Sequence, residues 1–223
     1  MALRTRVAQE RQARMDLILE SAERLFVGKG YADTSILDIA RQADFSRTSI
    51  YQYFASKEEI YASILDRYTD LLTERVAKAV TAAPTAPDKI RAFLEGIRQM
   101  MKERPNFFEL YFIQRHQVQP RLCAERKRQL NEKRRGLENV FREAYQEGIR
   151  KGEVRNIRFK DASNLFFAQI MGMMLLHEYY GDEFDVTLDE HLDQCLELYL
   201  EFVQKADSRR ETKRFSRMQT SAA

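Results

Sequence analysis

The chain has 223 residues, enough for one sizeable domain or two small ones, and 44% of them are hydrophobic, which suffices for a core. Its net charge of +3 excludes attraction of nucleic acid by overall charge, so any such contact needs a local basic patch. Cys123 and Cys195 form no CxxC pair, which argues against a disulfide scaffold or a metal site and predicts buried or half-buried thiols in a reducing compartment.

Few glycines and prolines favour a mostly helical chain, and the first helix is indicated by apolar residues at intervals of three and four. These residues are Met15, Ile18, Leu19, Ala22, Leu25 and Phe26. Gly28 and Gly30 are expected to end the helix. Thr34 or Ser35 then caps a second helix, which stops near Asp44.

A third, very short helix is expected after Ser46, with Ile50 and Phe54 facing inward. The sequence Ser56-Lys57-Glu58-Glu59 predicts a capping box that opens a fourth helix, running to about residue 79. Residues 10–57 therefore contain three helices, and the turn between the last two has only three or four residues. This is the spacing of a helix-turn-helix.

The sequence TAAPTAP at residues 81–87 interrupts the chain and predicts a boundary between two parts. Further helices are expected at 88–103, 105–116, 121–151, 160–180 and 187–206. Gly152 suits a position just after a helix end. The tail from residue 208 is polar and basic, and we expect it to be disordered.

Residues 30–60 strongly resemble the tetracycline-repressor (TetR) family of bacterial transcription regulators. The resemblance lies in Gly30-Tyr31, Thr34-Ser35-Ile36, Ile39-Ala40, Ser46, Ile50-Tyr51, Tyr53-Phe54 and Ser56-Lys57. One departure is Asp44-Phe45, where the family usually has Gly-Val. Aspartate enters the left-handed region at moderate cost, so the turn can persist. The larger phenylalanine is expected to affect which half-site is recognised rather than whether DNA is bound.

The resemblance implies an all-α protein with an N-terminal DNA-binding domain, residues 1–57, and a connecting helix at 56–79. Residues 80–206 would then form an effector-binding and dimerisation domain, and 207–223 a basic tail. A short helix that enters the major groove needs hydrogen-bond donors at its leading end. The expected DNA-binding residues are Thr34, Ser35, Ser46, Arg47, Thr48, Ser49, Tyr51, Gln52, Tyr53 and Lys57. Taken singly, the serines are helix caps and the tyrosines could close a small core.

Basic residues at both ends of the chain leave two interpretations open. Arg4, Arg6, Arg11 and Arg14 could extend the DNA contact into the minor groove, but a solvated leader is the favoured interpretation. The same holds for Arg209, Arg210, Lys213, Arg214 and Arg217 in the tail.

The helix at 160–180 is apolar nearly all round, so one side needs a partner beyond its own domain. Together with the last helix it predicts a four-helix homodimer interface, with a monomer core as the alternative. The expected interface residues are Leu165, Phe166, Ile170, Met173, Leu192, Leu196, Tyr199 and Phe202. A two-fold dimer would present two recognition helices about 34–36 Å apart to a palindromic operator.

In the family, the intervening helices enclose a pocket for a small effector, often apolar or aromatic. The corresponding residues here are Phe107, Phe108, Tyr111, Phe112, His116, Phe141, Tyr145, Phe167, Gln169, Met171, Met174 and His177, although ordinary core packing explains most of them individually.

The predicted function is a ligand-responsive regulator of transcription, a repressor released from its operator by an effector. The alternative is a carrier or buffer of apolar ligands that no longer binds DNA. His116, His177 and His191 lack the spacing of a nucleophile, metal or phosphate site, so no enzyme, catalytic residue, metal or cofactor is expected. The polar amino terminus and the short apolar run at 165–176 predict a cytoplasmic protein that does not cross a membrane.

Overall fold

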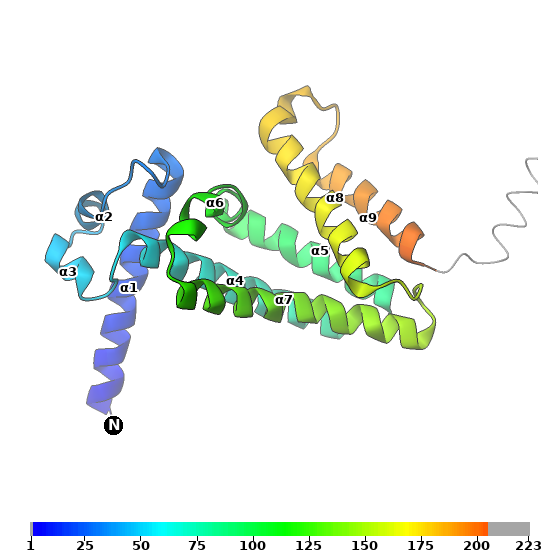
Figure 1. Cartoon of the computed structure of the whole chain (residues 1–223), viewed down its shortest axis with the longest axis horizontal. Helices are drawn as coiled ribbons and strands as arrows, with labels where there is room; N and C mark the ends of the chain where they lie inside the picture. Colours follow the sequence, from blue (N-terminus) through cyan, green and yellow to red (C-terminus); the bar gives the residue numbers. More distant parts are fainter. Residues whose placement is uncertain (1, 205–223) are drawn as a thin grey trace, which may run out of the picture. The chain divides into compact units, whose positions relative to one another are not determined.

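The computed structural model describes residues 2–204, with side chains from residue 6 on, and this part of the chain is helical (Figure 1). The helices are α1 Ala2–Lys29, α2 Ile36–Gln42, α3 Arg47–Tyr51, α4 Lys57–Ala82, α5 Ala86–Glu103, α6 Arg115–Val118, α7 Ala124–Lys151, α8 Phe159–Tyr180 and α9 Leu188–Val203. A π-helix, η1 Glu109–Ile113, and two 3-10 turns, η2 Gln119–Arg121 and η3 Gly181–Glu183, complete them. Residues 2–204 hold only an isolated β-bridge, between Val154 and Gln204, so the all-α prediction is confirmed. The predicted tail, 207–223, lies outside the described residues.

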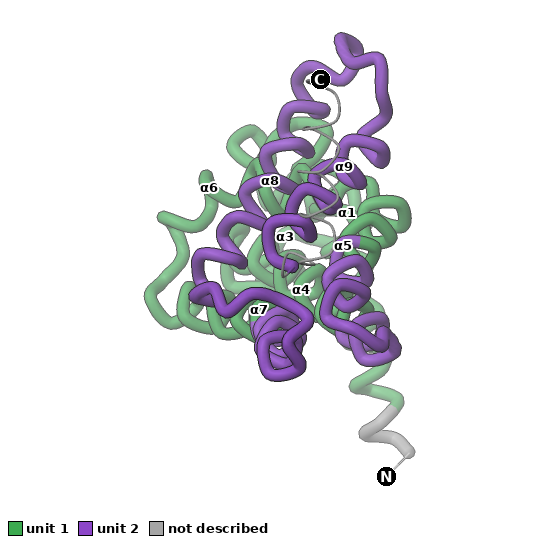
Figure 2. Tube along the Cα trace, turned by 90° about the vertical axis from the view of Figure 1, so that its right-hand side faces the viewer, with its two compact units in different colours: residues 1–76, 95–138 green, residues 77–94, 139–223 purple. Residues whose placement is uncertain are grey.

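The chain divides into two compact units (Figure 2). Unit 1 combines residues up to 76 with 95–138, and unit 2 combines residues 77–94 with those from 139 on. The divisions fall inside α4, α5 and α7, so each of these helices contributes to both units. The functional boundary expected near residue 80 stays a prediction.

The core of unit 1 fixes the short helices α2 and α3 against α1 and α4. The rings of Phe26, Tyr31 and Tyr61 contact one another with centroid distances of 5.3–5.4 Å and are fully buried. Ile50 and Phe54, the two residues expected to face inward from α3, are also buried. Because α3 is only five residues long, this apolar anchoring rather than its intrinsic propensity keeps it in place.

Glycine ends the first helix, but only one of the two expected glycines does so. Gly30 has φ +85°, a left-handed conformation that glycine adopts without steric cost, and α1 stops at Lys29. Gly28 lies inside the helix, so the prediction that it contributes to the end was wrong.

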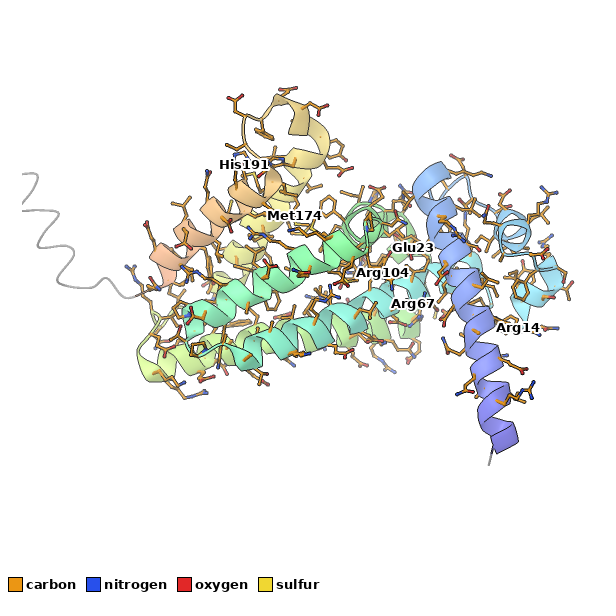
Figure 3. All side chains as sticks on the ribbon, turned by 180° about the vertical axis from the view of Figure 1, so that it is seen from behind. Arg14, Glu23, Arg67, Arg104, Met174 and His191 are labelled. Carbon is orange, nitrogen blue, oxygen red and sulfur yellow. The ribbon has the colours of Figure 1, made fainter. Side chains whose placement is uncertain are left out.

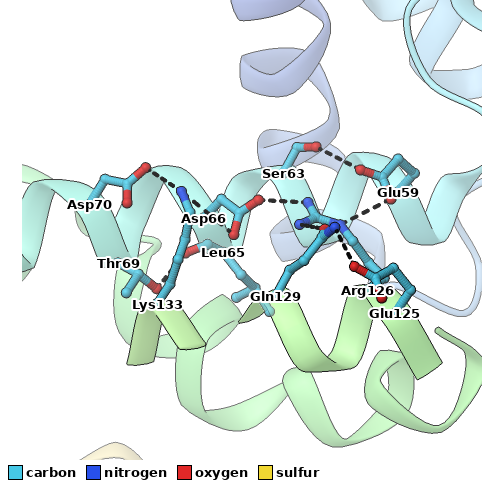
Figure 4. A network of polar contacts seen from close by, with 10 residues as sticks. All are labelled: Glu59, Ser63, Leu65, Asp66, Thr69, Asp70, Glu125, Arg126, Gln129 and Lys133. Atoms are coloured by element: carbon cyan, nitrogen blue, oxygen red, sulfur yellow. Dashed lines mark hydrogen bonds and ion pairs between the residues drawn. The ribbon is translucent and has the colours of Figure 1, made fainter. Parts of the chain in front are cut away.

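The predicted capping box at Ser56 forms only in half, because its glutamate is used elsewhere. The Ser56 Oγ accepts a hydrogen bond from the N–H of Glu59 at 3.2 Å. The Glu59 carboxylate instead accepts from Arg126 Nε of α7 at 3.1 Å, and Arg126 Nη2 lies 2.7 Å from Asp66 of α4 (Figure 4). Burial lowers the pKa of Arg126, but the two carboxylates raise it above its ordinary value. Lys133 Nζ adds a second contact to α4, 2.5 Å from Asp70.

The helix predicted at 105–116 is broken into a π-helix and a single short turn. Residues Glu109–Ile113 form η1, and α6 begins only at Arg115. Two long-range bonds hold this irregular backbone: Tyr61 Oη donates to the Leu110 carbonyl at 2.5 Å, and Gln114 Nε2 donates to the Phe26 carbonyl at 2.9 Å. Such contacts make an extra residue in a helical turn tolerable, and periodicity does not reveal them.

The core of unit 2 is aromatic. Phe93, Phe141 and Phe166 lie within 4.9–6.0 Å of one another by ring centroid, and Phe166 also contacts Tyr199 at 5.1 Å. Helices α8 and α9 run side by side (Figure 1). A Cβ on Gly148 would lie 2.3 Å from the Cβ of Ala86, so this close approach of α5 and α7 requires glycine.

The remaining predicted helices are confirmed within about three residues, and Gly152 follows α7 with φ +73° as expected. Cys195 is half-buried, whereas Cys123 is exposed in the loop before α7, against the prediction of a buried or half-buried thiol. Within residues 2–204, none of the helices combines the length and apolar composition needed to cross a bilayer.

Candidate nucleic-acid interface

The start of α2 is defined by Ser35. Its Oγ accepts a hydrogen bond from the Asp38 N–H at 3.1 Å, and its own N–H donates to the Asp38 carboxylate at 2.9 Å. The Ser35 hydroxyl also donates to this carboxylate at 2.7 Å. The two bonds that the Ser35 hydroxyl and N–H donate lower the pKa of Asp38 to about 2, so the carboxylate is ionised at neutral pH. Ser35 is exposed, which leaves it beside the outer surface as predicted.

Thr34 does not reach that surface, so its predicted DNA contact is corrected. Its side chain is 1% exposed, and its hydroxyl lies 2.8 Å from the Gly30 carbonyl oxygen and 3.2 Å from that of Leu25. The hydroxyl therefore ties the end of α1 to the start of α2. The sequence does not distinguish a threonine hydroxyl that bonds the protein backbone from one that bonds DNA.

The turn between α2 and α3 depends on Asp44. This residue has φ +59°, which confirms that aspartate occupies the left-handed position usually filled by glycine. The next residue, Phe45, donates its N–H to the Ala40 carbonyl at 2.8 Å. With the bond from the Asp44 N–H to the Arg41 carbonyl at 3.3 Å, this closes the end of α2 as a Schellman motif.

The leading end of α3 carries hydroxyls and one cation, as predicted. Ser46 Oγ accepts from the Ser49 N–H at 3.0 Å and lies 2.8 Å from the Ser49 Oγ, so both serines serve the cap. Arg47 and Thr48 are exposed, and the Arg47 guanidinium carbon lies 5.8 Å from the centre of the Tyr51 ring. Free donors and the positive end of the helix dipole together suit an anionic partner.

The far end of α3 presents Tyr51, Gln52 and Tyr53. Tyr51 is 46% exposed, Gln52 is exposed and Tyr53 is half-buried. Tyr53 contacts Phe45 edge-on at 6.3 Å, and the Arg11 guanidinium carbon lies 5.0 Å from its ring centre. The sequence places Arg11 among the basic residues before the first predicted helix, and it does not predict this contact because no local pattern links α1 to α3.

Lys57 is engaged within the protein, which corrects its predicted role as a phosphate contact. Its Nζ donates to the carbonyls of Tyr31, Ala32 and Thr34 at 2.7, 3.3 and 2.7 Å, using all three protons of the ammonium. Burial lowers the pKa of Lys57. The residue therefore clamps the α1–α2 turn onto the start of α4.

Comparison with known proteins agrees with this geometry. Residues 18–64, which span this interface, match the sequence model of "Bacterial regulatory proteins, tetR family". The chain belongs to the TetR family. It is 28% identical over 115 residues to the transcriptional activator FasR of Mycolicibacterium smegmatis, a match that spans 52% of each chain.

Two other relatives match this TetR-family chain over more of its length. An uncharacterized transcriptional regulator of Bacillus subtilis, YfiR, is 25% identical over 202 residues, which cover 90% of this chain and 97% of YfiR. The crystal structure of FadR from Bacillus subtilis, in complex with stearoyl-CoA, superposes with a TM-score of 0.71 at 22% identity, covering 82% of this chain and 96% of FadR. This likeness concerns the fold.

In this TetR-family protein the residues predicted to line a pocket separate into the two units. Phe107, Phe108 and Tyr111 are buried in unit 1 with the half-buried Phe112. His116 is exposed, with Nδ1 2.5 Å from the Ile113 carbonyl oxygen, so its predicted place in the pocket is corrected.

The other predicted pocket residues lie in unit 2. Phe141, Tyr145 and Met174 are buried, and Phe167, Gln169, Met171 and His177 are half-buried. Gln169 Oε1 and Tyr199 Oη are buried atoms without a hydrogen-bond partner among the described residues. His177 Nε2 lies 2.6 Å from His191 Nδ1, and loss of solvent and the neighbouring His191 lower the pKa of His177.

Most of the predicted dimer residues belong to the core of unit 2. Phe166, Ile170, Leu192, Leu196 and Tyr199 are at most 5% exposed, which corrects their assignment to an interface. Leu165 and Met173 are half-buried and Phe202 is 43% exposed. Apolar periodicity identified the buried stripe of each helix, whereas an interface needs residues that remain exposed, such as Leu176 and Leu198.

Proposed function

We propose that this TetR-family protein regulates transcription by binding a palindromic operator as a homodimer, with α3 of each subunit in the major groove. The observation that supports this most is the exposure of Arg47, Thr48, Tyr51 and Gln52 on α3 and its C-cap, while Ile50 of α3 and Phe54 just after it are buried. Each of these exposed side chains carries a hydrogen-bond donor. A duplex supplies acceptors that match it, at phosphates and at base edges.

The proposed roles follow from chemistry. Arg47 suits a guanine edge, because a guanidinium forms paired hydrogen bonds with two acceptors. Tyr51 and Gln52 suit phosphates and sugars, and Ser35 suits the opposite strand from the start of α2. These contacts would form in the cytoplasm, where bacterial DNA is found.

The test is binding of the full-length protein to duplexes selected from a random pool, measured by fluorescence anisotropy at several salt concentrations. We expect a palindromic consensus and a steep loss of affinity with salt, since counterions are released on binding. Arg47→Ala should weaken binding by about 10- to 100-fold and relax the preference at one base position. Arg14→Ala is the matched control, because Arg14 is exposed on α1 outside α2 and α3 (Figure 3). Selection of no sequence, or equal effects of the two variants, would contradict the proposal.

We further propose that dimerisation uses the exposed apolar residues of α8 and α9, above all Leu176, Leu198 and Phe202. Large apolar side chains left exposed on neighbouring helices favour association with a second copy. Sedimentation equilibrium should give a dimer for the wild type and a monomer for the variant Leu198→Lys/Phe202→Lys. Persistence of the dimer in that variant would place the interface elsewhere.

Regulation by a small apolar ligand is the third part of the proposal, with the protein acting as a repressor that the ligand releases. The aromatic cluster of unit 2 with its methionines offers an adaptable apolar lining, and Gln169 Oε1 and Tyr199 Oη offer polar anchors. The FadR structure holds stearoyl-CoA, so long-chain acyl-CoA is the first ligand to test.

Stearoyl-CoA should lower operator affinity by about 5- to 150-fold, whereas CoA alone should not, since only differential affinity for two states shifts an equilibrium. Tightened DNA binding would indicate an activator. Ligand binding by a protein that never binds DNA would identify the carrier. Gln169→Leu tests whether the amide contributes to the site, with Gln129→Leu on the exposed side of α7 as the control.

A further inference from the structure

The far end of α3 is held by a residue of α1 that no sequence motif includes. Arg11 Nη2 donates to the Gln52 carbonyl at 3.3 Å, and the same guanidinium lies 5.0 Å from the Tyr53 ring centre. Gln52 and Tyr53 directly follow the last residue of α3. A single cation therefore contacts both the backbone at the helix end and the aromatic side chain beside it.

Phe45 contacts the same tyrosine from the other end of α3. Its ring meets that of Tyr53 edge-on at 6.3 Å, with an interplanar angle of 76°. Phe45 is aimed by the left-handed turn at Asp44, the residue that precedes it. Since a valine would lack an aromatic edge, the Asp44-Phe45 pair does more than substitute for the usual turn. It gives Tyr53 a second neighbour.

We propose that Arg11 is a positioning residue that, with Phe45, fixes the Tyr53 ring and so orients the far end of α3 for DNA binding. The inference rests on the proposed function and specifies how that interface is ordered. Three features support it. The helix has only five residues, so its carboxyl end is weakly held by its own bonding. A cation at that end is favoured by the helix dipole, and its N–H donates to the exposed carbonyl. The ring contact gives the guanidinium a defined place despite its exposure.

Arg11 would therefore act through Tyr53 rather than by touching a phosphate. A direct phosphate contact adds about one unit to the slope of log affinity against log salt, and its loss removes that unit. Loss of a positioning residue weakens binding without changing the slope. The two roles are thus separable in one experiment.

The first measurement needs no DNA. Hydrogen exchange of the full-length protein should become faster at the amides of residues 52–54 in Arg11→Ala, and stay unchanged in Arg14→Ala. Unchanged exchange in Arg11→Ala would overturn the inference. This result is independent of the operator, so it decides the positioning role even if the protein selects no DNA and the proposed function fails.

The second measurement uses the duplex selected by the wild type. Arg11→Ala should weaken binding by about tenfold at an unchanged salt slope, and its effect should largely vanish in a Tyr53→Phe background, because the positioned hydroxyl is already absent. Phe45→Val should likewise weaken binding, and less than additively with Arg11→Ala. A slope reduced by about one unit with an effect additive to Tyr53→Phe would make Arg11 a phosphate contact and overturn the proposal. So would unaltered affinity in Arg11→Ala.

Discussion

Residues 30–56 and residues 104–133 of unit 1 both contain irregular backbone, yet the polar bonds at their helix starts and turns come from very different distances along the chain. In the first region, Ser35 bonds Asp38 and Ser46 bonds Ser49, each three positions away. In the second, Gln114 bonds the Phe26 carbonyl, 88 positions away, and Arg126 bonds Glu59, 67 positions away.

The difference determines what holds each region in shape. Side-chain caps satisfy the backbone at the start of α2 and α3 without help from elsewhere. The π-helix and the start of α7 instead depend on partners from α1 and α4, so their geometry exists only when those helices are already in place. Substitutions in the second region should therefore cost more stability than substitutions of equally sized groups in the first.

The largest effect is expected for Arg126→Ala. The Arg126 and Asp66 side chains are 12% and 19% exposed, so the variant leaves a largely buried carboxylate whose remaining cation, Lys133 Nζ, lies 3.8 Å away. We expect the free energy of unfolding to fall by about 2–3 kcal/mol. This is less than the roughly 3–5 kcal/mol lost when one partner of a fully buried ion pair is removed, because some solvent reaches both groups. Urea denaturation measures this. The control is Arg128→Ala, whose arginine side chain is 67% exposed and should contribute less than about 0.5 kcal/mol. Similar values for the two variants would refute the distinction.

Tyr61→Phe should have the next largest effect. The variant lacks the hydroxyl through which the fully buried Tyr61 bonds the Leu110 carbonyl of the π-helix. The expected loss is about 1–2 kcal/mol in the same urea experiment, with faster amide exchange across residues 109–114. Tyr51→Phe, on an exposed tyrosine, should leave both measurements unchanged. An intact exchange pattern in Tyr61→Phe would show that η1 does not need the bond.

Ser46→Ala tests the local region and should cost about 1 kcal/mol, since it removes the N-cap of α3. Ser46→Gly should cost only a few tenths of a kcal/mol by the same principle. The control is Thr48→Ala, because Thr48 is the exposed second residue of α3 and does not cap the helix. A loss as large as that of Tyr61→Phe would remove the contrast between the two regions.

Asp44→Gly should have the smallest effect, a change of less than about 0.5 kcal/mol in unfolding free energy. Glycine removes the steric cost of φ +59° but gains entropy in the unfolded chain, and these terms oppose each other. Asp44→Val is the informative comparison, because a β-branched residue in this conformation should destabilise the turn clearly. Equal stability of the two variants would mean that the turn tolerates any residue.

The sequence alone determined the features that depend on neighbours a few residues away. It predicted the all-α class, the helix-turn-helix, a cap at Thr34 or Ser35, the cap at Ser46, an end of α1 at Gly28 and Gly30, and the left-handed Asp44. Such features can be predicted from the sequence because caps, turns and amphipathic faces follow from local sterics and hydrogen bonding. The outward placement of Arg47, Tyr51 and Gln52 also followed, once Ile50 and Phe54 were assigned to the core.

Only the tertiary structure decided the features that depend on which distant groups meet. In the structure, Thr34 and Lys57 form hydrogen bonds within the protein instead of the predicted DNA contacts. The helix predicted at 105–116 is interrupted by a π-helix. Five residues predicted at an interface are buried in the core of unit 2. The tertiary structure also brings Arg11 to Tyr53. The physical reason is the same in each case: a polar or apolar residue type specifies that a partner is needed, and only the packed chain specifies which partner it is.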